Sequence, residues 1–336
     1  MPMIQTSRLN THVVEHGTGE TRVLLLHGNV SSSAFFVPLL ETIPSSWSVI
    51  APDLRGYGAS ETKPIDATRG LADWADDIWA LLEQKGWTQN VHILGWSMGG
   101  GIATQLCIEH PVAFKSLTLV APISPYGFGG THDINGTANS PDFAGSGGGT
   151  VNADFVKAIE NRDSSDAQGS PRWVLNNFYF KAGFRVPLQL EQNLLESMFS
   201  TACGADNYPG DMLPSQHYPM VAPGTRGVAN AFSPKYQNLS AFATQKHIPV
   251  LWVRGAHDQI VSDTSSFDMA FLGSLGIIPG YPGADICPPQ AMNNQTRALL
   301  EAHGNYREVI FEDSGHTPFL EEQQRFMGVL TEFIGL

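Results

Sequence analysis

The feature of this sequence that most constrains its fold is a regular alternation of short apolar runs with segments of helical periodicity. The apolar runs have the length of strands and occupy residues 23–26, 47–52, 91–96, 115–121, 249–254 and 307–311. The helical segments occupy residues 33–41, 71–82, 98–109, 265–275, 290–303 and 319–334. Because runs this apolar suit strands that are buried on both faces, the alternation predicts an α/β protein with a mostly parallel sheet covered by helices on both faces.

The alternation is interrupted once, between residues 122 and 247. This part contains glycine-rich stretches and an aromatic segment at 173–180 that resembles an amphipathic helix. We therefore predict a core formed by residues 1–122 and 248–336 and an inserted, mainly helical cap at 123–247. The glycine run at 145–149 lacks the Lys-Ser or Lys-Thr of a phosphate-binding loop, so we expect a flexible hinge or tip there.

The charge balance restricts the partners of the chain. Its 336 residues include 32 Asp and Glu but only 19 Lys and Arg, for a formal net charge of −13, and no basic run occurs. Nucleic-acid binding relies on clustered Lys and Arg, so we expect no nucleic-acid partner. The sequence shows neither a signal-peptide pattern at its start nor 18 consecutive apolar residues. We therefore expect a soluble, cytoplasmic protein with no membrane partner.

The cysteines give no sign of a metal site. Cys107, Cys203 and Cys287 are far apart, and no Cys-x-x-Cys occurs. This spacing predicts no zinc site and no disulfide framework, so we expect free thiols and no bound metal. A bridge between Cys203 and Cys287 remains open.

The most informative motif is Gly95-Trp-Ser-Met-Gly99, which lies between the run at 91–96 and the helical segment at 98–109. A sharp turn from strand to helix lifts the serine hydroxyl clear of the sheet, and the flanking glycines allow the close backbone approach that this turn requires. The helix N-terminus also favours developing negative charge. The motif therefore predicts Ser97 as a catalytic nucleophile.

A serine hydroxyl needs a base to take its proton and a group to orient that base. Of the 11 histidines, His316 follows the last apolar run in a loop that Gly315 and Pro318 make tight, and we assign it as the general base. The orienting acid should lie after a neighbouring strand and before the histidine in the chain. Asp258 follows the run at 249–254 and is our choice, whereas Asp263 and Asp268 enter the next helix.

An oxyanion hole needs backbone N–H groups that point at the developing charge. Met98, directly after the serine, can supply one of them. The second should come from the loop after the first apolar run, where Gly28 permits the necessary turn. We choose the N–H of Asn29, with that of Val30 as the alternative.

Together these residues resemble the α/β-hydrolase superfamily, in the branch that carries a helical cap. The resemblance rests on five motifs in order: His27-Gly28, Asp53-Leu-Arg-Gly-Tyr-Gly-Ala-Ser60, Gly95-Trp-Ser-Met-Gly-Gly100, Gly255-Ala-His-Asp258 and Ser314-Gly-His316. It covers roughly residues 1–122 and 248–336. It implies an eight-stranded sheet whose second strand is antiparallel, an acyl-enzyme mechanism and no cofactor.

The type of nucleophile narrows the chemistry. Haloalkane dehalogenases and epoxide hydrolases of this fold carry an aspartate at the position of Ser97, and serine suits attack on a carbonyl instead. We therefore predict a serine hydrolase that cleaves a carboxylic ester or lactone of a moderately hydrophobic small molecule. The alternatives are carbon–carbon hydrolysis of a β-diketone or ring-cleavage product, perhydrolysis, or ligand binding on a hydrolase scaffold. The acyl and alcohol groups and the oligomeric state remain open.

Aromatic residues close to these motifs are candidates for the substrate pocket. Trp96 flanks the nucleophile, and Phe35 and Phe36 follow the predicted oxyanion loop. In the cap, Trp173 and Phe178 lie on the predicted amphipathic helix, whose apolar face would cover the site and exclude water.

Overall fold

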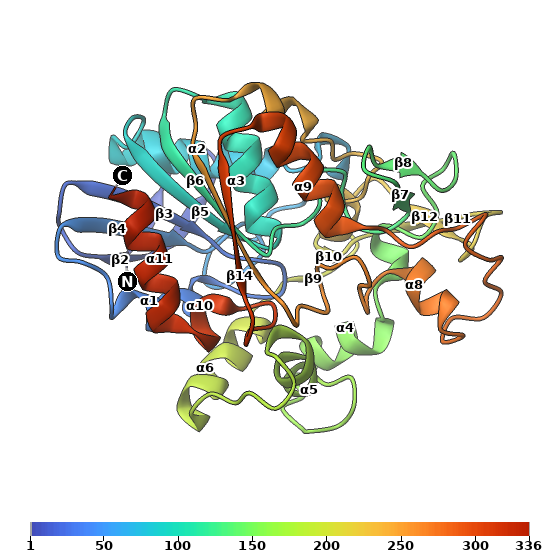
Figure 1. The fold of residues 1–336 in the computed structure, drawn as a ribbon. Helices are drawn as coiled ribbons and strands as arrows, with labels where there is room; N and C mark the ends of the chain where they lie inside the picture. The colour runs from blue at the N-terminus through green and yellow to red at the C-terminus, as the bar shows by residue number, and fades with distance from the viewer. Residues whose placement is uncertain (1, 336) are drawn as a thin grey trace.

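A central eight-stranded sheet organises the computed structural model, which describes residues 2–335. The strand order is β1-β2-β4-β3-β5-β6-β13-β14 (Figure 1). The strands are β1 Met3–Gln5, β2 Asn10–His16, β3 Thr21–Leu26, β4 Trp47–Pro52, β5 Val91–Trp96, β6 Phe114–Val120, β13 Val250–Gly255 and β14 Tyr306–Phe311. Only β2 runs antiparallel to its neighbours β1 and β4. The expected eight-stranded, mostly parallel sheet is therefore confirmed.

Helices connect the parallel strands, and two further helices follow the last strand. They are α1 Val37–Leu40, α2 Ala72–Lys85, α3 Met98–Glu109, α8 Met269–Ser274, α9 Met292–His303, α10 Pro318–Glu321 and α11 Gln323–Ile334. A 3₁₀ turn at Ser33–Phe36 precedes α1. The single helix predicted at 319–334 is wrong, because Glu322 leaves the helical region with φ −125° and ψ 48° between α10 and α11.

The segment 123–247 combines short helices with small two-stranded pairings. Its helices are α4 Ala153–Glu160, α5 Pro171–Val174, a π-helical turn Leu175–Tyr179, α6 Leu188–Phe199 and α7 Val228–Ala231, with 3₁₀ turns at Gly148–Thr150 and Ser240–Thr244. Its strand pairs are β7 Thr131–His132 with β8 Thr137–Ala138, β9 Cys203–Gly204 with β10 Tyr208–Pro209, and β11 Met212–Pro214 with β12 Val221–Pro223. Figure 1 shows α4, α5 and α6 together below the sheet. The domain boundaries at 122 and 248 stay a prediction.

The glycine run at 145–149 is not a surface tip, so that part of the prediction is wrong, whereas a hinge at this place stays a prediction. Ala144, Ser146 and Gly148 are buried. The N–H of Gly148 donates to Asn230 Oδ1 at 2.9 Å. The glycines are needed for space, because a Cβ on Gly147 would lie 2.4 Å from the same Asn230 oxygen. The run is therefore packed inside the cap.

Three further expectations concern the cysteines, membrane spans and metal-binding groups. All three cysteines are free, so the bridge between Cys203 and Cys287 does not form in this structure. None of the helices within residues 2–335 combines the length and the apolar character needed to cross a lipid bilayer. In the same residues, no group of three or more His, Cys, Asp or Glu side chains is arranged to hold a metal ion.

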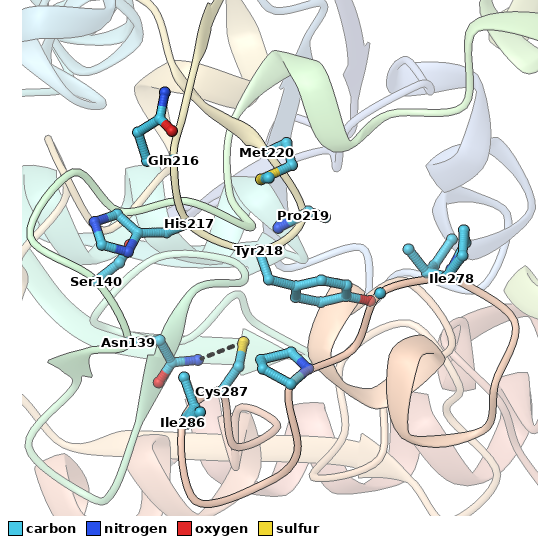
Figure 2. Close-up of a pocket in the computed structure, with 13 residues that line it drawn as sticks. Asn139, Ser140, Gln216, His217, Tyr218, Pro219, Met220, Ile278, Ile286 and Cys287 are labelled. Atoms are coloured by element: carbon cyan, nitrogen blue, oxygen red, sulfur yellow. Dashed lines mark hydrogen bonds between the residues drawn. The ribbon is translucent and has the colours of Figure 1, made fainter.

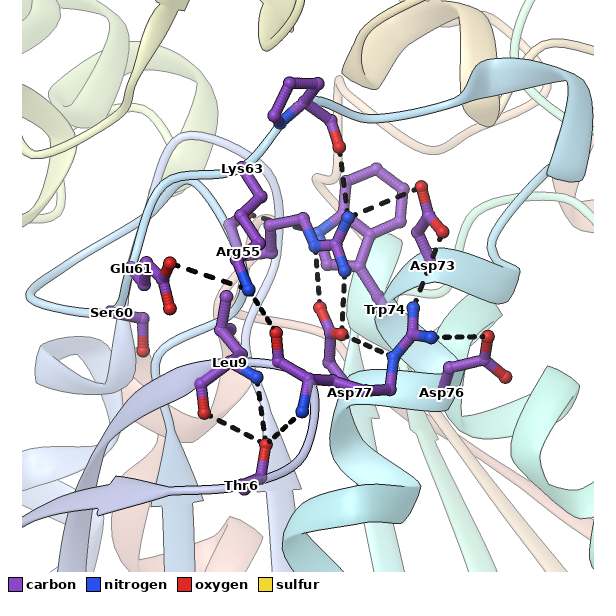
Figure 3. A network of polar contacts seen from close by, with 12 residues as sticks. Thr6, Leu9, Arg55, Ser60, Glu61, Lys63, Asp73, Trp74, Asp76 and Asp77 are labelled. Carbon is purple, nitrogen blue, oxygen red and sulfur yellow. Dashed lines mark hydrogen bonds and ion pairs between the residues drawn. The ribbon is translucent and has the colours of Figure 1, made fainter.

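A cluster of ion pairs joins the loop after β4 to helix α2 (Figure 3). Arg55 donates through Nε and Nη2 to the two carboxylate oxygens of Asp77, at 2.7 and 2.8 Å. Arg8 donates to the same carboxylate at 2.9 Å. The side chains of Arg55 and Asp77 are only 8% and 4% exposed, so little water screens this two-pronged pair.

Replacing Asp77 by alanine is expected to lower the free energy of unfolding by about 3–5 kcal/mol, because it leaves the buried Arg55 guanidinium without its main partner. Urea denaturation measures this loss. Asp154→Ala is the matched control, since Asp154 pairs with Lys157 at the surface, where the two side chains are 88% and 67% exposed. This variant should lower the free energy of unfolding by less than about 1 kcal/mol. Equal losses in the two variants would contradict the importance of the buried cluster.

Candidate active site

Ser97 lies at the sharp turn between β5 and α3. Its φ of +56° and ψ of −121° are rarely adopted by a residue with a side chain, and such strain is typical of functional sites. The backbone fixes this turn, since Ser97 N–H donates to the Val120 carbonyl at 2.9 Å. A Cβ on Gly95 would lie 2.2 Å from the Gly99 carbonyl oxygen, so glycine is required there. The strand–turn–helix context expected for this motif is therefore present.

His316 and Asp258 form a buried pair at the ends of the neighbouring strands β14 and β13. His316 Nδ1 lies 2.8 Å from Asp258 Oδ2, and both side chains are 2% exposed. The other carboxylate oxygen of Asp258 accepts the N–H groups of Ile260 and Val261 at 2.8 and 3.0 Å. With the carboxylate ionised, Nδ1 is the donor, and Nε2 is left free to accept a proton.

The two alternative acids have other partners. Asp263 accepts the N–H groups of Asn293 and Asn294 at the start of α9. Asp268 caps α8 through Ala270 N–H and accepts Gln290 N–H at 2.9 Å. Burial raises the pKa of Asp268 to about 6. Both carboxylates thus accept N–H groups at the start of a helix or in the connection before it. Of the three acids, Asp258 is the one that contacts His316.

Ser97 and His316 line the same cavity, which has a volume of about 300 Å³. The sheet side of its wall includes Asn29, Val30 and Met98. Apolar and aromatic residues form most of the remainder: Ile123, Phe128, Val151, Phe155, Trp173, Val174, Phe178, Tyr179, Tyr208, Phe232, Ile260, Phe267, Met269 and Leu272. Within residues 2–335, no Asp, Glu, Lys or Arg contributes to this wall. The site is therefore a largely apolar chamber, with Thr150, Asn152 and Ser266 as further polar residues of its wall.

The loop after β3 lies directly against the nucleophile. A Cβ on Gly28 would come within 2.9 Å of Ser97 Cβ, so only glycine lets the loop approach this closely. In the described part of the chain, no backbone carbonyl accepts the N–H of Asn29, Val30 or Met98. Free N–H groups beside a nucleophile are what an oxyanion hole requires. Both Asn29 and Val30 line the cavity, so the choice between them stays a prediction.

His27 supports this loop from below. Its Nε2 accepts the N–H of Leu54 at 2.9 Å, and its Nδ1 lies 2.8 Å from the Gly28 carbonyl oxygen. Burial lowers the pKa of His27 to about 4. The ring is therefore neutral at pH 7, and it fixes the loop without lining the cavity.

The aromatic residues proposed for the pocket divide into two groups. Trp173 and Phe178 line the cavity, as expected. Trp96, Phe35 and Phe36 do not; they are fully buried beneath it, so their assignment to the pocket is corrected. Trp96 instead donates from Nε1 to the His316 carbonyl at 2.8 Å and thereby supports the histidine loop.

Several residues of the cavity wall carry no signal in the sequence. These include Phe128, Phe155, Tyr208, Phe232 and Phe267. They come from the cap or from the connection before α8, where no motif distinguishes a pocket residue from a core residue. Val174 and Tyr179 had a signal, since both belong to the segment at 173–180 that resembles an amphipathic helix.

A second hollow, of about 490 Å³, lies between the connection of β11 to β12 and the segment at 278–287 (Figure 2). It contains neither Ser97 nor His316. Its cysteine, Cys287, accepts a hydrogen bond from Asn139 Nδ2 at 3.6 Å. Burial raises the pKa of this thiol, which keeps it in the unreactive protonated form. We therefore place the candidate active site in the smaller cavity.

Comparison with known proteins gives a consistent family match. Residues 21–281 match the family model described as alpha/beta hydrolase fold. Among curated proteins, the probable lysophospholipase BODYGUARD 2 of Arabidopsis thaliana is 39% identical over 109 residues, which are 31% of this chain and 22% of the relative. The match to this relative therefore spans less than a quarter of its length.

Solved structures match over nearly the whole chain. An esterase from Exiguobacterium antarcticum superimposes with a TM-score of 0.60 at 20% identity, over 99% of this chain and 98% of that one. The enol-lactonase from Burkholderia xenovorans LB400 superimposes with a TM-score of 0.60 at 15% identity, over 100% of both chains. At these identities the likeness concerns the fold alone.

Proposed function

The chain belongs to the α/β-hydrolase fold family, and on this premise we propose that it is a serine hydrolase with Ser97, Asp258 and His316 as its catalytic residues. The single observation that carries the proposal is the geometry of the cavity. A strained serine at the end of β5 and a histidine bonded to a buried aspartate line the same apolar chamber. Nucleophile, base and orienting acid are the parts that acyl transfer requires.

The proposed reaction begins when His316 Nε2 takes the proton of Ser97 Oγ as this oxygen attacks the carbonyl carbon of the substrate. The N–H groups of Met98 and of Asn29 stabilise the negative charge that develops on the carbonyl oxygen. His316 then gives its proton to the leaving oxygen, and an acyl-enzyme remains. Water, deprotonated by His316, releases the acid. Asp258 holds the imidazole in place and stabilises its positive charge without taking the proton.

The substrate proposed is a carboxylic ester or a lactone of a moderately hydrophobic, uncharged small molecule. A charged group would lose its hydration in this cavity, and the wall offers no Asp, Glu, Lys or Arg within residues 2–335 to replace it. A volume of about 300 Å³ suits a small ligand. The names of the structural neighbours, an esterase and an enol-lactonase, agree with this choice of bond.

A matched pair of esters tests the proposal. We expect the wild type to hydrolyse p-nitrophenyl butyrate and to turn over p-nitrophenyl hemisuccinate with a kcat/KM lower by at least about 10- to 100-fold. Desolvating an unpaired neutral polar group already costs about 1–3 kcal/mol, and an unpaired charge costs more. The two acyl groups have similar length and differ mainly in the terminal carboxylate. Release of p-nitrophenol measures both rates.

A lactone and a vinylogous β-diketone complete the panel, and reaction with a fluorophosphonate reports a reactive serine independently of the substrate. Turnover of the diketone alone would identify a carbon–carbon hydrolase and contradict the proposed bond. A folded protein that neither turns over any ester nor reacts with the fluorophosphonate would be a binding protein.

A further inference from the structure

We propose that Tyr179, on the cap, is a positioning residue that holds the predicted oxyanion loop and the His316 loop in their active arrangement. This inference rests on the proposed function, and it concerns a residue with no part in the chemical steps described above. Tyr179 is the last residue of the π-helical turn Leu175–Tyr179, which the N–H of Phe180 closes onto the Leu175 carbonyl at 3.1 Å. Single π-helical turns occur frequently at functional sites.

The hydroxyl of Tyr179 contacts the predicted oxyanion loop on both sides of Val30. It lies 3.0 Å from the carbonyl oxygen of Asn29 and 3.2 Å from that of Val30, so its single proton is shared between them. Val30 has a φ of +48°, which is unusual for a β-branched residue and costs of order 1–3 kcal/mol. Tyr179 therefore holds the two peptide groups that flank a strained residue.

This contact also controls the direction of an N–H group. In a trans peptide the C=O and the N–H point in opposite directions. The carbonyl of Asn29 belongs to the same peptide group as the N–H of Val30, so fixing the carbonyl fixes that N–H as well. Without the hydroxyl, Val30 could relax toward negative φ, and both candidate donors of the loop would move relative to Ser97.

The backbone of the same residue holds the histidine loop. The carbonyl oxygen of Tyr179 accepts the N–H of His316 at 2.9 Å and the hydroxyl of Thr317 at 3.1 Å. The ring of Tyr179 meets the His316 ring edge-on at a centroid distance of 6.0 Å. One residue of the cap thus touches both the loop of the predicted oxyanion donors and the loop of the predicted base.

The carboxylate of Glu321 also joins the cap to the histidine loop. Lys181 N–H donates to Glu321 Oε1 at 2.6 Å, and Gly315 N–H donates to the same carboxylate at 2.9–3.0 Å. A Cβ on Gly315 would lie 2.6 Å from Lys181 N, so the cap backbone packs directly on the histidine loop. The cap segment at 179–181 is therefore built into the site.

Tyr179→Phe removes the hydroxyl and keeps the ring. We expect kcat for p-nitrophenyl butyrate to fall on the order of 10- to 100-fold, below the loss for complete removal of an oxyanion donor, while KM changes less than about twofold. Affinity for an arylboronic acid, which forms a tetrahedral anion on the serine, should fall by a similar factor. A residue that only stabilised the fold would not change kcat and boronate affinity together.

Tyr236→Phe is the matched control, because this cap tyrosine donates to the Gly224 carbonyl at 2.8 Å and does not line the cavity. It should leave kcat, KM and boronate affinity unchanged. Unchanged kcat in Tyr179→Phe, or a higher KM at constant kcat, would overturn the positioning role. A wild type inert toward both the ester and the fluorophosphonate would instead overturn the proposed function, and this role with it.

Thr317→Val provides a second test that holds even if Tyr179→Phe does not fold. It removes the hydroxyl whose proton is shared between the Tyr179 carbonyl and Glu321 Oε2, both at 3.1 Å, and keeps the size of the side chain. A lower kcat at constant KM would support the role of the contact between Tyr179 and the His316 loop. Unchanged kinetics would overturn that role.

Discussion

Replacing Ser97 by alanine is expected to abolish both ester hydrolysis and reaction with a fluorophosphonate. The hydroxyl is the only group of the proposed site that can form the acyl-enzyme, so kcat should fall on the order of 10⁶-fold. The fold should persist, because alanine keeps the Cβ that packs near Gly28 and the N–H that donates to Val120. Mass spectrometry of the labelled protein and release of p-nitrophenol measure the two losses.

Ser116→Ala is the control for this variant. Ser116 is a buried serine on β6 whose Oγ lies 2.7 Å from His92 Nδ1, away from the cavity. It should keep both hydrolysis and labelling. Labelling of Ser97→Ala at the wild-type level would show that another residue is the nucleophile, and the proposed mechanism would be wrong.

The second large effect is expected for Asp258→Asn, with a loss on the order of 10⁴-fold in kcat. An amide NH₂ group facing His316 donates a hydrogen bond, which forces Nδ1 to accept and places the imidazole proton on Nε2. That tautomer cannot take the proton of Ser97. The amide oxygen can still accept the N–H groups of Ile260 and Val261, so the variant should fold. Steady-state kinetics with p-nitrophenyl butyrate measure the loss.

Asp263→Asn provides the comparison, since Asp263 accepts the N–H groups of Asn293 and Asn294 at the start of α9. An amide oxygen can accept the same two bonds, so activity should stay within about twofold. Near-full activity of Asp258→Asn, together with a large loss in Asp263→Asn, would show that Asp263 and not Asp258 orients His316.

The sheet shows where sequence patterns succeed and where they fail. The strands at the centre, such as β3 and β5, are buried on both faces and appear as continuous apolar runs. The edge strand β1 is mostly exposed, and the only apolar residues of β2 are the adjacent Val13 and Val14, so neither strand was predicted from its pattern. The break at Glu322 between α10 and α11 was also missed. Its carboxylate accepts the hydroxyl of Ser314 at 2.7 Å, a contact that exists only in the folded chain.

The sequence by itself determined the turn at Ser97, the loop at Gly28 and the positions of Asp258 and His316 after two strands. Each of these is a local pattern, because a strand, a glycine turn and a helix are specified by residues close together in the chain. The wall of the cavity was decided only by the tertiary structure. Phe35 and Phe178 are equally apolar in the sequence, yet one is buried beneath the site and the other faces it.

The contacts of Tyr179 could not be predicted from the sequence either, because they join residues far apart in the chain. Its hydroxyl reaches Asn29, which is 150 residues away in sequence, and its carbonyl reaches Thr317, 138 residues away. No local pattern encodes contacts of this range, because they depend on how the cap packs across the carboxyl ends of the strands. The sequence therefore determined the positions of the groups that we propose for catalysis, whereas the packing of the cap decided what surrounds them and which cap residue contacts both of their loops.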